Sequence, residues 1–575
     1  MYYKRFAAAL LLFAGCILSC KKEKLNYSYD NRHDTIVGGS SNVRLVNLLG
    51  NNQLAINGER LTGYLVLQPP VGGGEPLYPG TYWFPANGKM GTTFTIPRQF
   101  LTNGKAMVSS DNMAFQSPSD SIGFEITEEY NKPKDYYMVR SLPYTAAATE
   151  RVTAIPRDIT APAKAGYFKI RLVNMGDEVA ASNNAENLAL PLTLAYADGT
   201  PVSNATSNIN THSWSDYVEL PYGTYQFKVL TPSGTEVSSV SGNGVEQTNI
   251  IEPATSTLVK PVNGFPNAVS TGLTFGPVKT FQPGGVYTIA VGVTRMTAPY
   301  VYGTPGESFP FYQNTFRIIA DISEPANTDY YRLQAVQANP DEAQVTFRVN
   351  GEKLGDAGYA AHTGYGIYIT GETTIEALDA AGKVIASAKQ LLKPGLNYTA
   401  WLYLTPEGKA AISLVNNNLS GGWYAVRPDN TGQDGIYNRM LNEYPFNLRF
   451  LNFCPDLPYV SFTMDNGQAV GSETGSRNLQ PGIPALELPY ARFNQVQEAY
   501  RILAYRSGPG VYPGTWLSEI PVLKSTDLIA RPDAYVRPVK PVHEPGIYTI
   551  ALIGRLKGNL PEATKAKMII IKHTK

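Results

Sequence analysis

The chain has 575 residues, with 48 Lys and Arg against 47 Asp and Glu, so its formal net charge is only +1. That balance lacks the basic face that nucleic-acid binding demands, and nucleic acid is therefore excluded as a partner. The 52 Gly, 42 Pro and 37 Tyr are typical of short strands joined by turns. At about 150 residues per domain, a chain of this length predicts three or four domains.

The N-terminus has the parts of a secretory signal. Lys4 and Arg5 precede an uncharged, mostly apolar run from Phe6 to Leu18 that has small residues near its end. The run is too short to cross a bilayer as a stable helix, since that takes about 20 residues. We therefore expect residues 1–19 to be a cleaved signal peptide and the polar residues 20–40 to be a flexible tether.

The stretch Ile17-Leu18-Ser19-Cys20 resembles the lipobox of bacterial lipoproteins. The resemblance implies that the Cys20 thiol receives a diacylglyceryl group and that cleavage makes Cys20 the first residue of the mature chain. Its acyl chains would then hold the protein at the lipid bilayer. Cys16 is a weaker competitor, because cleavage there would leave Ile17 and Leu18 in the mature chain. Since no Asp follows Cys20, the resemblance implies the outer membrane of a Bacteroidota-type bacterium, on either its periplasmic or its outer face.

One short pattern recurs four times after the tether. It reads VRLVN, IRLVN, YRLQAVQANPD and LRFLN, and its arginines are Arg44, Arg171, Arg332 and Arg449. The irregular spacing suits domains with loop insertions better than the fixed repeat of a solenoid. We therefore expect a divergent β-sandwich at 41–163, a second at 164–327, a third at 328–420, a linker at 421–444 and a fourth β-sandwich at 445–575.

The third unit shows the strand pattern most clearly. In AQVTFRVNG, Val345, Phe347 and Val349 alternate with polar residues before an Asn-Gly turn. PGLNYTAWLYL then gives a Pro-Gly turn and a strand with Tyr-Thr near its start, and similar segments begin at Pro283 and Pro545. Short strands with turns every 8–12 residues or so predict tandem immunoglobulin-like antiparallel β-sandwiches, an all-β fold class. We expect the aliphatic residues beside each repeated arginine to lie in the core and the arginine to point outward.

Two segments carry a family resemblance. ANPDEAQVTFRVNG, from Ala338 to Gly351, and FCPDLPYVSFTMDNG, from Phe453 to Gly467, each place a Pro-Asp turn before a strand that ends in Asn-Gly. This order is similar to the bacterial repeat family called domain of unknown function 4397, which the second unit resembles in IRLVN and LPYGTYQFKV. The resemblance implies Ig-like sandwiches in cell-envelope proteins. It carries over no catalytic or ligand residue, because the family is defined without a known activity.

The sequence lacks the usual signatures of catalysis. Its histidines lie at no zinc-site spacing, Cys454 has no partner for a disulfide or metal cluster, and neither a Gly-x-Ser-x-Gly elbow nor a P-loop is present. Glu125, Glu128 and Glu129 are the carboxylates nearest to a glycosidase pair, but their segment is typical of a strand end and a solvated loop. DNTGQDG, at 429–435, only faintly resembles a calcium loop. We expect no catalytic residue, no metal and no cofactor.

Aromatic residues in expected loops are the candidates for ligand contact. Tyr and Trp rings stack on sugar faces while their polar edges stay in water, and they lose little entropy on binding. We name Tyr300, Tyr302, Trp423 and Tyr424 as candidate ligand-binding residues. The alternative is that these rings pack between neighbouring sandwiches. Trp401 lies in an expected strand and is predicted to be structural.

These observations predict a non-catalytic lipoprotein of the cell envelope whose tandem Ig-like domains bind a glycan or an envelope protein. Two alternatives stay open, a hydrolase that acts on envelope polysaccharide at a site between domains and a purely structural spacer. Carboxylates converging in a cleft would favour the enzyme. Failure to bind sugars, envelope fractions or proteins would favour the spacer.

Overall fold

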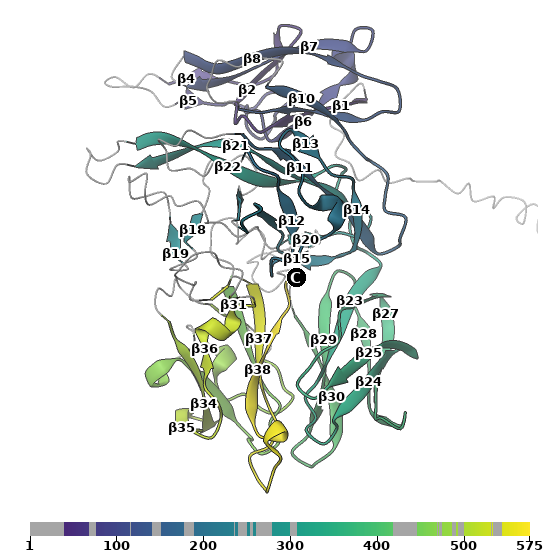
Figure 1. Cartoon of the computed structure of the whole chain (residues 1–575), viewed down its shortest axis with the longest axis vertical. Coiled ribbons are helices and arrows are strands. Elements are labelled where there is room, and N and C mark those ends of the chain that lie inside the picture. Colours follow the sequence, from purple (N-terminus) through teal and green to yellow (C-terminus); the bar gives the residue numbers. More distant parts are fainter. Residues whose placement is uncertain are drawn as a thin grey trace, which may run out of the picture.

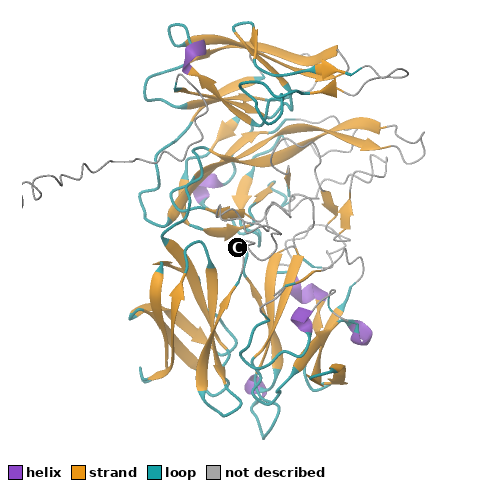
Figure 2. Ribbon diagram, turned by 180° about the vertical axis from the view of Figure 1, so that it is seen from behind, coloured by secondary structure: helices purple, strands orange, loops and turns teal. Residues whose placement is uncertain are grey.

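The computed structural model describes the following residues: 39–67, 76–114, 117–140, 151–177, 189–234, 236–239, 250–252, 257–259, 279–299, 308–417, 446–468, 470, 474–485, 490–492, 499–530, 532, 543–544 and 546–575. Strands dominate this part of the chain (Figure 2). Its helices are single 3-10 turns: η1 (Arg98–Phe100), η4 (Asn204–Thr206), η5 (Asp465–Gly467), η6 (Thr474–Ser476), η7 (Ser525–Leu528) and η9 (Glu562–Thr564). The prediction of an all-β, multi-domain sandwich fold is confirmed.

Four sandwiches follow one another along the chain, and we name them by order. The first contains β1 to β10, the second β11 to β22, the third β23 to β30 and the fourth β31 to β38. In Figure 1 the first sandwich lies on top of the second, and the third and fourth stand side by side below. The molecule is therefore built as two pairs of sandwiches.

The first sandwich has two four-stranded sheets and one small pair. One sheet has the order β10 (Val152–Pro156), β9 (Lys134–Met138), β1 (Ser40–Asn47), β6 (Thr93–Pro97). The other has the order β3 (Glu59–Arg60), β2 (Gln53–Ile56), β7 (Lys105–Ala114), β8 (Ser117–Thr127). The pair is β4 (Leu65–Val66) with β5 (Pro76–Leu77).

The second sandwich combines one large sheet with three strand pairs. The large sheet has the order β13 (Ser213–Trp214), β11 (Tyr167–Met175), β21 (Val286–Pro299), β22 (Ser308–Ala320), β17 (Ser238–Ser239), and β14 (Val218–Pro221) also pairs with β11. The pairs are β12 (Thr193–Ala195) with β16 (Lys228–Leu230), β15 (Gly223–Tyr225) with β20 (Lys279–Phe281), and β18 (Ile250–Glu252) with β19 (Thr257–Val259).

The third and fourth sandwiches each have two sheets. Those of the third are β26 (Gly366–Ile369), β23 (Tyr330–Gln337), β29 (Asn397–Leu404), β30 (Ala410–Asn416), and β25 (Glu352–Gly358), β24 (Gln344–Val349), β27 (Gly371–Leu378), β28 (Val384–Leu392). Those of the fourth are β33 (Ala491–Arg492), β31 (Phe446–Asn452), β37 (Gly546–Ile553), β38 (Lys567–Lys572), and β32 (Val460–Thr463), β34 (Arg501–Gly508), β35 (Val511–Trp516), with β36 (Leu523–Lys524) paired to β34.

One strand arrangement is common to all four sandwiches. The strand that carries the repeated arginine lies inside its sheet and runs parallel to a strand near the end of the same sandwich, whereas most other pairs are antiparallel. The residues paired across this parallel step are Arg44 with Asp135, Arg171 with Thr288, Arg332 with Asn397, and Arg449 with Thr549. The first sandwich thus has the same central topology as the others, although its β9 lacks the Pro-Gly turn seen in the sequence of the later units.

Alternation of side chains builds the cores, as the third sandwich shows. Val345, Phe347 and Val349 on β24 are buried, and the strand ends in a turn in which Asn350 and Gly351 have φ of 51° and 85°. A type I′ hairpin turn needs positive φ at both central residues, so this Asn-Gly turn forms as predicted. Tyr398, Ala400 and Leu402 on β29 face the same core.

The residues on the other face of β29 have a different neighbour. Trp401 is 1% exposed and stacks on Phe453 of the fourth sandwich, with ring centroids 4.8 Å apart. It belongs to a separate apolar cluster in which β23, β29 and β30 meet β31, β37 and β38. A matching cluster joins the first and second sandwiches through residues such as Val46 and Ala290. The prediction that Trp401 is structural is confirmed, and the sheets that carry the arginines pack against each other in pairs.

The last residues of the chain connect the two pairs. Lys575 donates its backbone N–H to Thr224 O at 3.5 Å and accepts from Gln226 N at 3.0 Å, so it lies against the second sandwich. Nearby, a Cβ on Gly223 would come within 2.2 Å of Arg332 Nη1, so this guanidinium of the third sandwich lies directly against the backbone of β15. The second, third and fourth sandwiches therefore meet around the C-terminal segment, near the centre of Figure 1.

Candidate functional site

The residues that the sequence singled out for lipidation and ligand contact lie outside the described part of the chain. They are Cys20, Tyr300, Tyr302, Trp423 and Tyr424. The possible calcium loop at 429–435 lies outside it as well. These assignments stay predictions, and the search for a site turns to the described residues.

The three neighbouring carboxylates of the first sandwich form surface ion pairs with separate partners. Glu125 pairs with Lys105 at 2.8 Å, and Glu128 pairs with Arg98 at 3.2 Å. Glu129 pairs with both Lys132 and Lys134, and these hydrogen bonds lower its pKa to about 2. A general acid needs a pKa near the working pH, so Glu129 is set up for charge pairing and not for proton transfer.

The repeated arginines point away from their own cores, as expected, but they are buried. Their exposed fractions are between 2% and 5%. Each does point away from its own core, as the alternation predicts, but the neighbouring sandwich or its own loops cover it. We call the surface between the first and second sandwiches the upper seam and that between the third and fourth the lower seam.

In the upper seam, Arg44 bridges two sandwiches. Its Nε and Nη2 donate to the two carboxylate oxygens of Asp135 at 2.9 and 2.6 Å, and Nη2 also lies 2.6 Å from Asp321 of the second sandwich. Nη1 donates to Ala320 O at 2.7 Å. Burial alone would lower the pKa of Arg44, but Asp135 and Asp321 raise it above its ordinary value. A charge-assisted bidentate pair of this kind fixes orientation as well as adding energy.

Arg171 reaches across the same seam in the opposite direction. Its Nη1 donates to Pro156 O of the first sandwich at 2.6 Å, and its Nε donates to Thr288 Oγ1 at 2.9 Å. Thr288 and Tyr217 both donate to Asp321, at 2.6 and 2.9 Å. The upper seam is therefore one connected network of charged groups.

In the lower seam a buried arginine also bonds across to the neighbouring sandwich, but its acceptors are neutral. Arg449 donates from Nη1 to Asn416 O and from Nη2 to Asn417 Oδ1, both at 2.6 Å, and its guanidinium lies 4.8 Å from the ring centre of Tyr490. Its Nε donates to Thr549 Oγ1 at 3.3 Å. No carboxylate of the described residues pairs with Arg449.

A buried histidine completes the lower seam. His573 Nδ1 lies 3.3 Å from Gln334 Nε2 and 3.1 Å from Tyr365 Oη, while its Nε2 lies 2.7 Å from Thr549 Oγ1. The Gln334 amide nitrogen can only donate, so Nδ1 accepts and Nε2 carries the proton. Burial, with the positive charge of Arg449 nearby, holds the pKa of His573 well below its usual range. These seam groups are enclosed and most of their polar atoms are paired within the described residues, which suits them to joining sandwiches.

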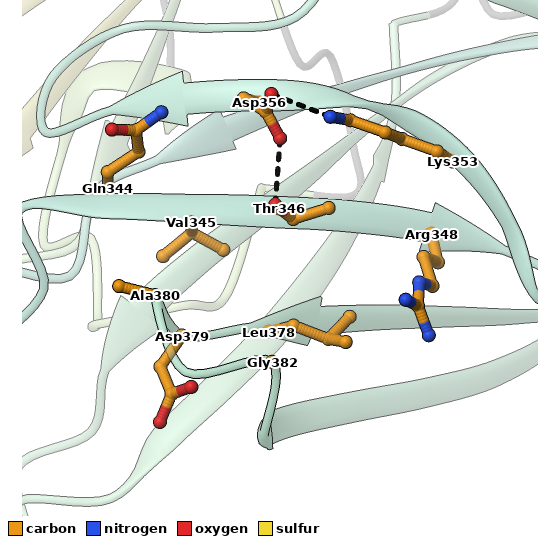
Figure 3. A pocket seen from close by; sticks show the side chains of 10 residues that line it. All are labelled: Gln344, Val345, Thr346, Arg348, Lys353, Asp356, Leu378, Asp379, Ala380 and Gly382. Carbon is orange, nitrogen blue, oxygen red and sulfur yellow. Dashed lines mark hydrogen bonds and ion pairs between the residues drawn. The ribbon is translucent and has the colours of Figure 1, made fainter.

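An open site lies instead on the outer sheet of the third sandwich. A depression of about 340 Å³ is lined by β24, β25 and the turn after β27 (Figure 3). Its lining residues are Gln344, Val345, Thr346, Arg348, Lys353, Asp356, Leu378, Asp379, Ala380 and Gly382. The outward-facing residues of β24 supply polar groups, because the inward positions of the same strand fill the core.

The acidic groups of this depression are held by close partners. Asp356 accepts from Thr346 Oγ1 and from Lys353 Nζ, each at 2.7 Å, and these bonds lower its pKa (Figure 3). Asp379 Oδ1 accepts two backbone N–H groups of its own turn, from Ala381 and Lys383, both at 2.9 Å. Both carboxylates are thus ordered, and Asp356 is poorly suited to act as a general acid.

Arg348 and Gln344 are the available donors of the depression. Both are exposed on β24, four residues apart on one face, and neither side chain forms a hydrogen bond with another described residue. Glu376 is the cross-strand neighbour of Arg348 on β27. The site can therefore offer guanidinium and amide groups to a bound molecule without first breaking an internal hydrogen bond.

Comparison with known proteins adds no family to this description. No protein-family model and no curated protein matches the chain. Within the described residues, no cluster of His, Cys, Asp or Glu could hold a metal ion, and no helix has the length and hydropathy to span a membrane. Cys454 is buried in the fourth sandwich, where burial raises its pKa to about 12. Sequence reasoning missed the depression, because exposed Gln, Arg and Lys on a strand are an ordinary solvent-facing pattern.

Proposed function

We propose that this protein is a non-catalytic binding protein of the bacterial cell envelope, anchored in the outer membrane by acylated Cys20, which binds a glycan at the depression of the third sandwich. The observation that carries the proposal is the depression itself, an open polar concavity on a rigid sheet. Sites on strands hold their side chains more precisely than sites on loops do. The anchor rests on the lipobox-like stretch that ends at Cys20.

The lining favours a glycan over a protein partner. Protein interfaces depend on a few buried aromatic or Arg anchors that fill pockets. The available donors of the depression are the guanidinium of Arg348 and the amide of Gln344, which are exposed and fill no pocket as such anchors do. Such groups suit the hydroxyl oxygens of a sugar chain.

The same residues give little support to a hydrolase. Glycosidases need two carboxyl groups, one of them with a raised pKa. Asp356 has a lowered pKa because of Lys353 and Thr346, and Asp379 is bonded to its own turn. A binding role therefore agrees better with the chemistry of the depression.

The chain from residue 21, which lacks the lipidated cysteine, allows a direct test. We expect it to bind at least one envelope glycan on a glycan array, and we expect Arg348→Ala with Gln344→Ala to weaken that binding about tenfold or more in calorimetry. Lys389→Ala is the matched control, because Lys389 is an exposed cation on β28 of the same sheet but does not line the depression.

Two results would count against the proposal. Equal glycan affinity of the double variant and the Lys389→Ala control would show that the depression does not contribute to binding. Absence of binding to any glycan, envelope fraction or protein would leave the structural spacer as the better account.

A further inference from the structure

The fourth sandwich carries a second exposed surface that the depression does not include. Trp516 on β35 is 49% exposed, although Trp is a residue that proteins usually bury to a large extent. Its direct cross-strand partner is Tyr505 on β34, which in turn pairs with Ser461 on β32. Directly paired residues of antiparallel strands share a face, so these three side chains form one row across the sheet. Trp516 and Tyr505 are accessible in this row, whereas Ser461 is fully buried at its far end.

Polar groups with free hydrogen-bonding capacity lie along this row. Ser461 Oγ lies 2.9 Å from Ser507 Oγ and accepts from Asn478 N at 3.0 Å, which brings Ser507 and Asn478 to the same end of the row. Within the described residues, the Tyr505 hydroxyl and the Asn478 side-chain NH₂ have no hydrogen-bond partner. The surface thus combines one apolar ring face with unpaired hydroxyl and amide groups.

The backbone holds the tryptophan in this register. Gly514 has a φ of +97°, and a Cβ at this position would lie 2.1 Å from Arg506 O. Only glycine allows β35 to approach β34 so closely. The register shift between Arg506 and Gly508 lies next to the pairing of Tyr505 with Trp516. The exposed indole is therefore placed by the strand and not by a loose loop.

From this combination we propose that the outer sheet of the fourth sandwich binds a neutral, pyranose-containing oligosaccharide, with one sugar ring stacked on Trp516. A pyranose presents a C–H face and equatorial hydroxyl groups, and the row presents an indole face and polar donors beside it. Tyr and Trp give large, rigid and amphipathic contact area at low cost in conformational entropy. Adjacent strands lie about 5 Å apart, so the accessible part of the row, from Trp516 to Tyr505, suits one stacked sugar ring with polar groups at its edge.

The charge of the row supports a neutral sugar. Its members Ser461, Tyr505, Ser507, Asn478 and Trp516 carry no formal charge. An anionic glycan would find no cation within the row itself. This surface is distinct from the depression on the third sandwich, so it goes beyond the function proposed above and would give the protein a second point of attachment.

Binding of neutral tetrasaccharides to the chain from residue 21 tests this assignment. Calorimetry with cellotetraose, laminaritetraose, mannotetraose and xylotetraose should show binding of at least one. We expect Trp516→Ala to weaken it about tenfold or more, and Trp516→Phe, which keeps an aromatic ring, to weaken it less. Trp214→Ala is the matched control, because Trp214 is 38% exposed on β13 of the second sandwich.

The outcomes separate this inference from the proposed function. Binding that falls in Trp516→Ala and persists in Arg348→Ala supports the stacking site alone. Binding that falls only in Arg348→Ala, unchanged affinity in both Trp516 variants, or no binding of any tetrasaccharide overturns it. Adhesion to phosphatidylcholine–phosphatidylglycerol vesicles that depends on Trp516, in the absence of sugar binding, would assign the indole to a membrane surface and also overturn it.

Discussion

In the upper seam Arg44 faces two carboxylates, whereas in the lower seam Arg449 faces an amide, a backbone carbonyl and a hydroxyl. The two arginines occupy the same place in the repeated topology. The same strand topology therefore allows the hydrogen bonds of a buried guanidinium to be made either to carboxylates or to neutral groups. Arg44 and Arg449 therefore both join neighbouring sandwiches, while their partner residues decide how strongly each seam depends on charge.

Substitution of the seam arginine should give the largest difference in stability loss between the two seams. Arg44→Ala would leave Asp321 buried without its paired cation and Asp135 with Arg157 alone, and loss of one partner of a buried ion pair typically destabilises by about 3–5 kcal/mol. Arg449→Ala would remove hydrogen bonds to neutral groups, for which about 1.5–3 kcal/mol is expected. Urea denaturation, with hydrogen exchange to locate the affected sandwiches, would measure both. A larger loss in Arg449→Ala would contradict the distinction between the seams.

Glycines at the two seams provide a second comparison. A Cβ on Gly482 would meet the Tyr403 ring at 2.3 Å in a backbone with φ of +73°, and a Cβ on Gly292 would meet Leu48 Cδ1 at 2.8 Å. We expect Gly482→Ala to destabilise by about 2–3 kcal/mol and Gly292→Ala by about 1–2 kcal/mol, because only the first adds backbone strain to overpacking. Thermal unfolding would rank the two variants. Gly351→Ala is an informative control, since its φ of +85° adds strain in open space.

Acid should weaken the lower seam through His573. Its pKa is lowered in the folded state, so the unfolded chain takes up the proton first, near the usual histidine pKa of about 6.5. Stability is therefore complete above that pH and is lost as pH falls toward the folded pKa, by at most about 1.4 kcal/mol per pH unit. Hydrogen exchange of β31 and β37 between pH 7 and pH 5 should show faster opening.

Substitution of the histidines would show which one is responsible. His573→Gln should flatten the pH dependence at the lower seam. His543→Gln is the matched variant, because the pKa of His543 is lowered by burial to about 3 but its ring contacts Tyr500 inside the fourth sandwich. An unchanged pH dependence in His573→Gln would show that His573 does not cause the loss of stability in acid.

Local sequence patterns predicted the strands, but they could not predict which residues of other sandwiches the strands contact. Alternation in AQVTFRVNG predicted the buried and exposed residues of β24 and its turn, since both depend on adjacent positions. The same alternation placed Arg44 outside its own core. It could not reveal Asp321, which lies 277 residues further along and covers Arg44 from another sandwich. The depression and the Trp516 row also join residues from several strands, and no single segment carries their pattern.

The parallel strand pair at the centre of every sandwich also affects how the chain folds. The first strand of each sandwich pairs with a strand far along the chain. The separations are 91 residues from Arg44 to Asp135, 117 from Arg171 to Thr288, 65 from Arg332 to Asn397 and 100 from Arg449 to Thr549. Such long-range pairing makes folding slow and leaves strand edges exposed meanwhile. During synthesis, no sandwich can complete its central sheet until nearly all of its own sequence has emerged. The upper seam must wait longer still, for Asp321 at the end of the second sandwich.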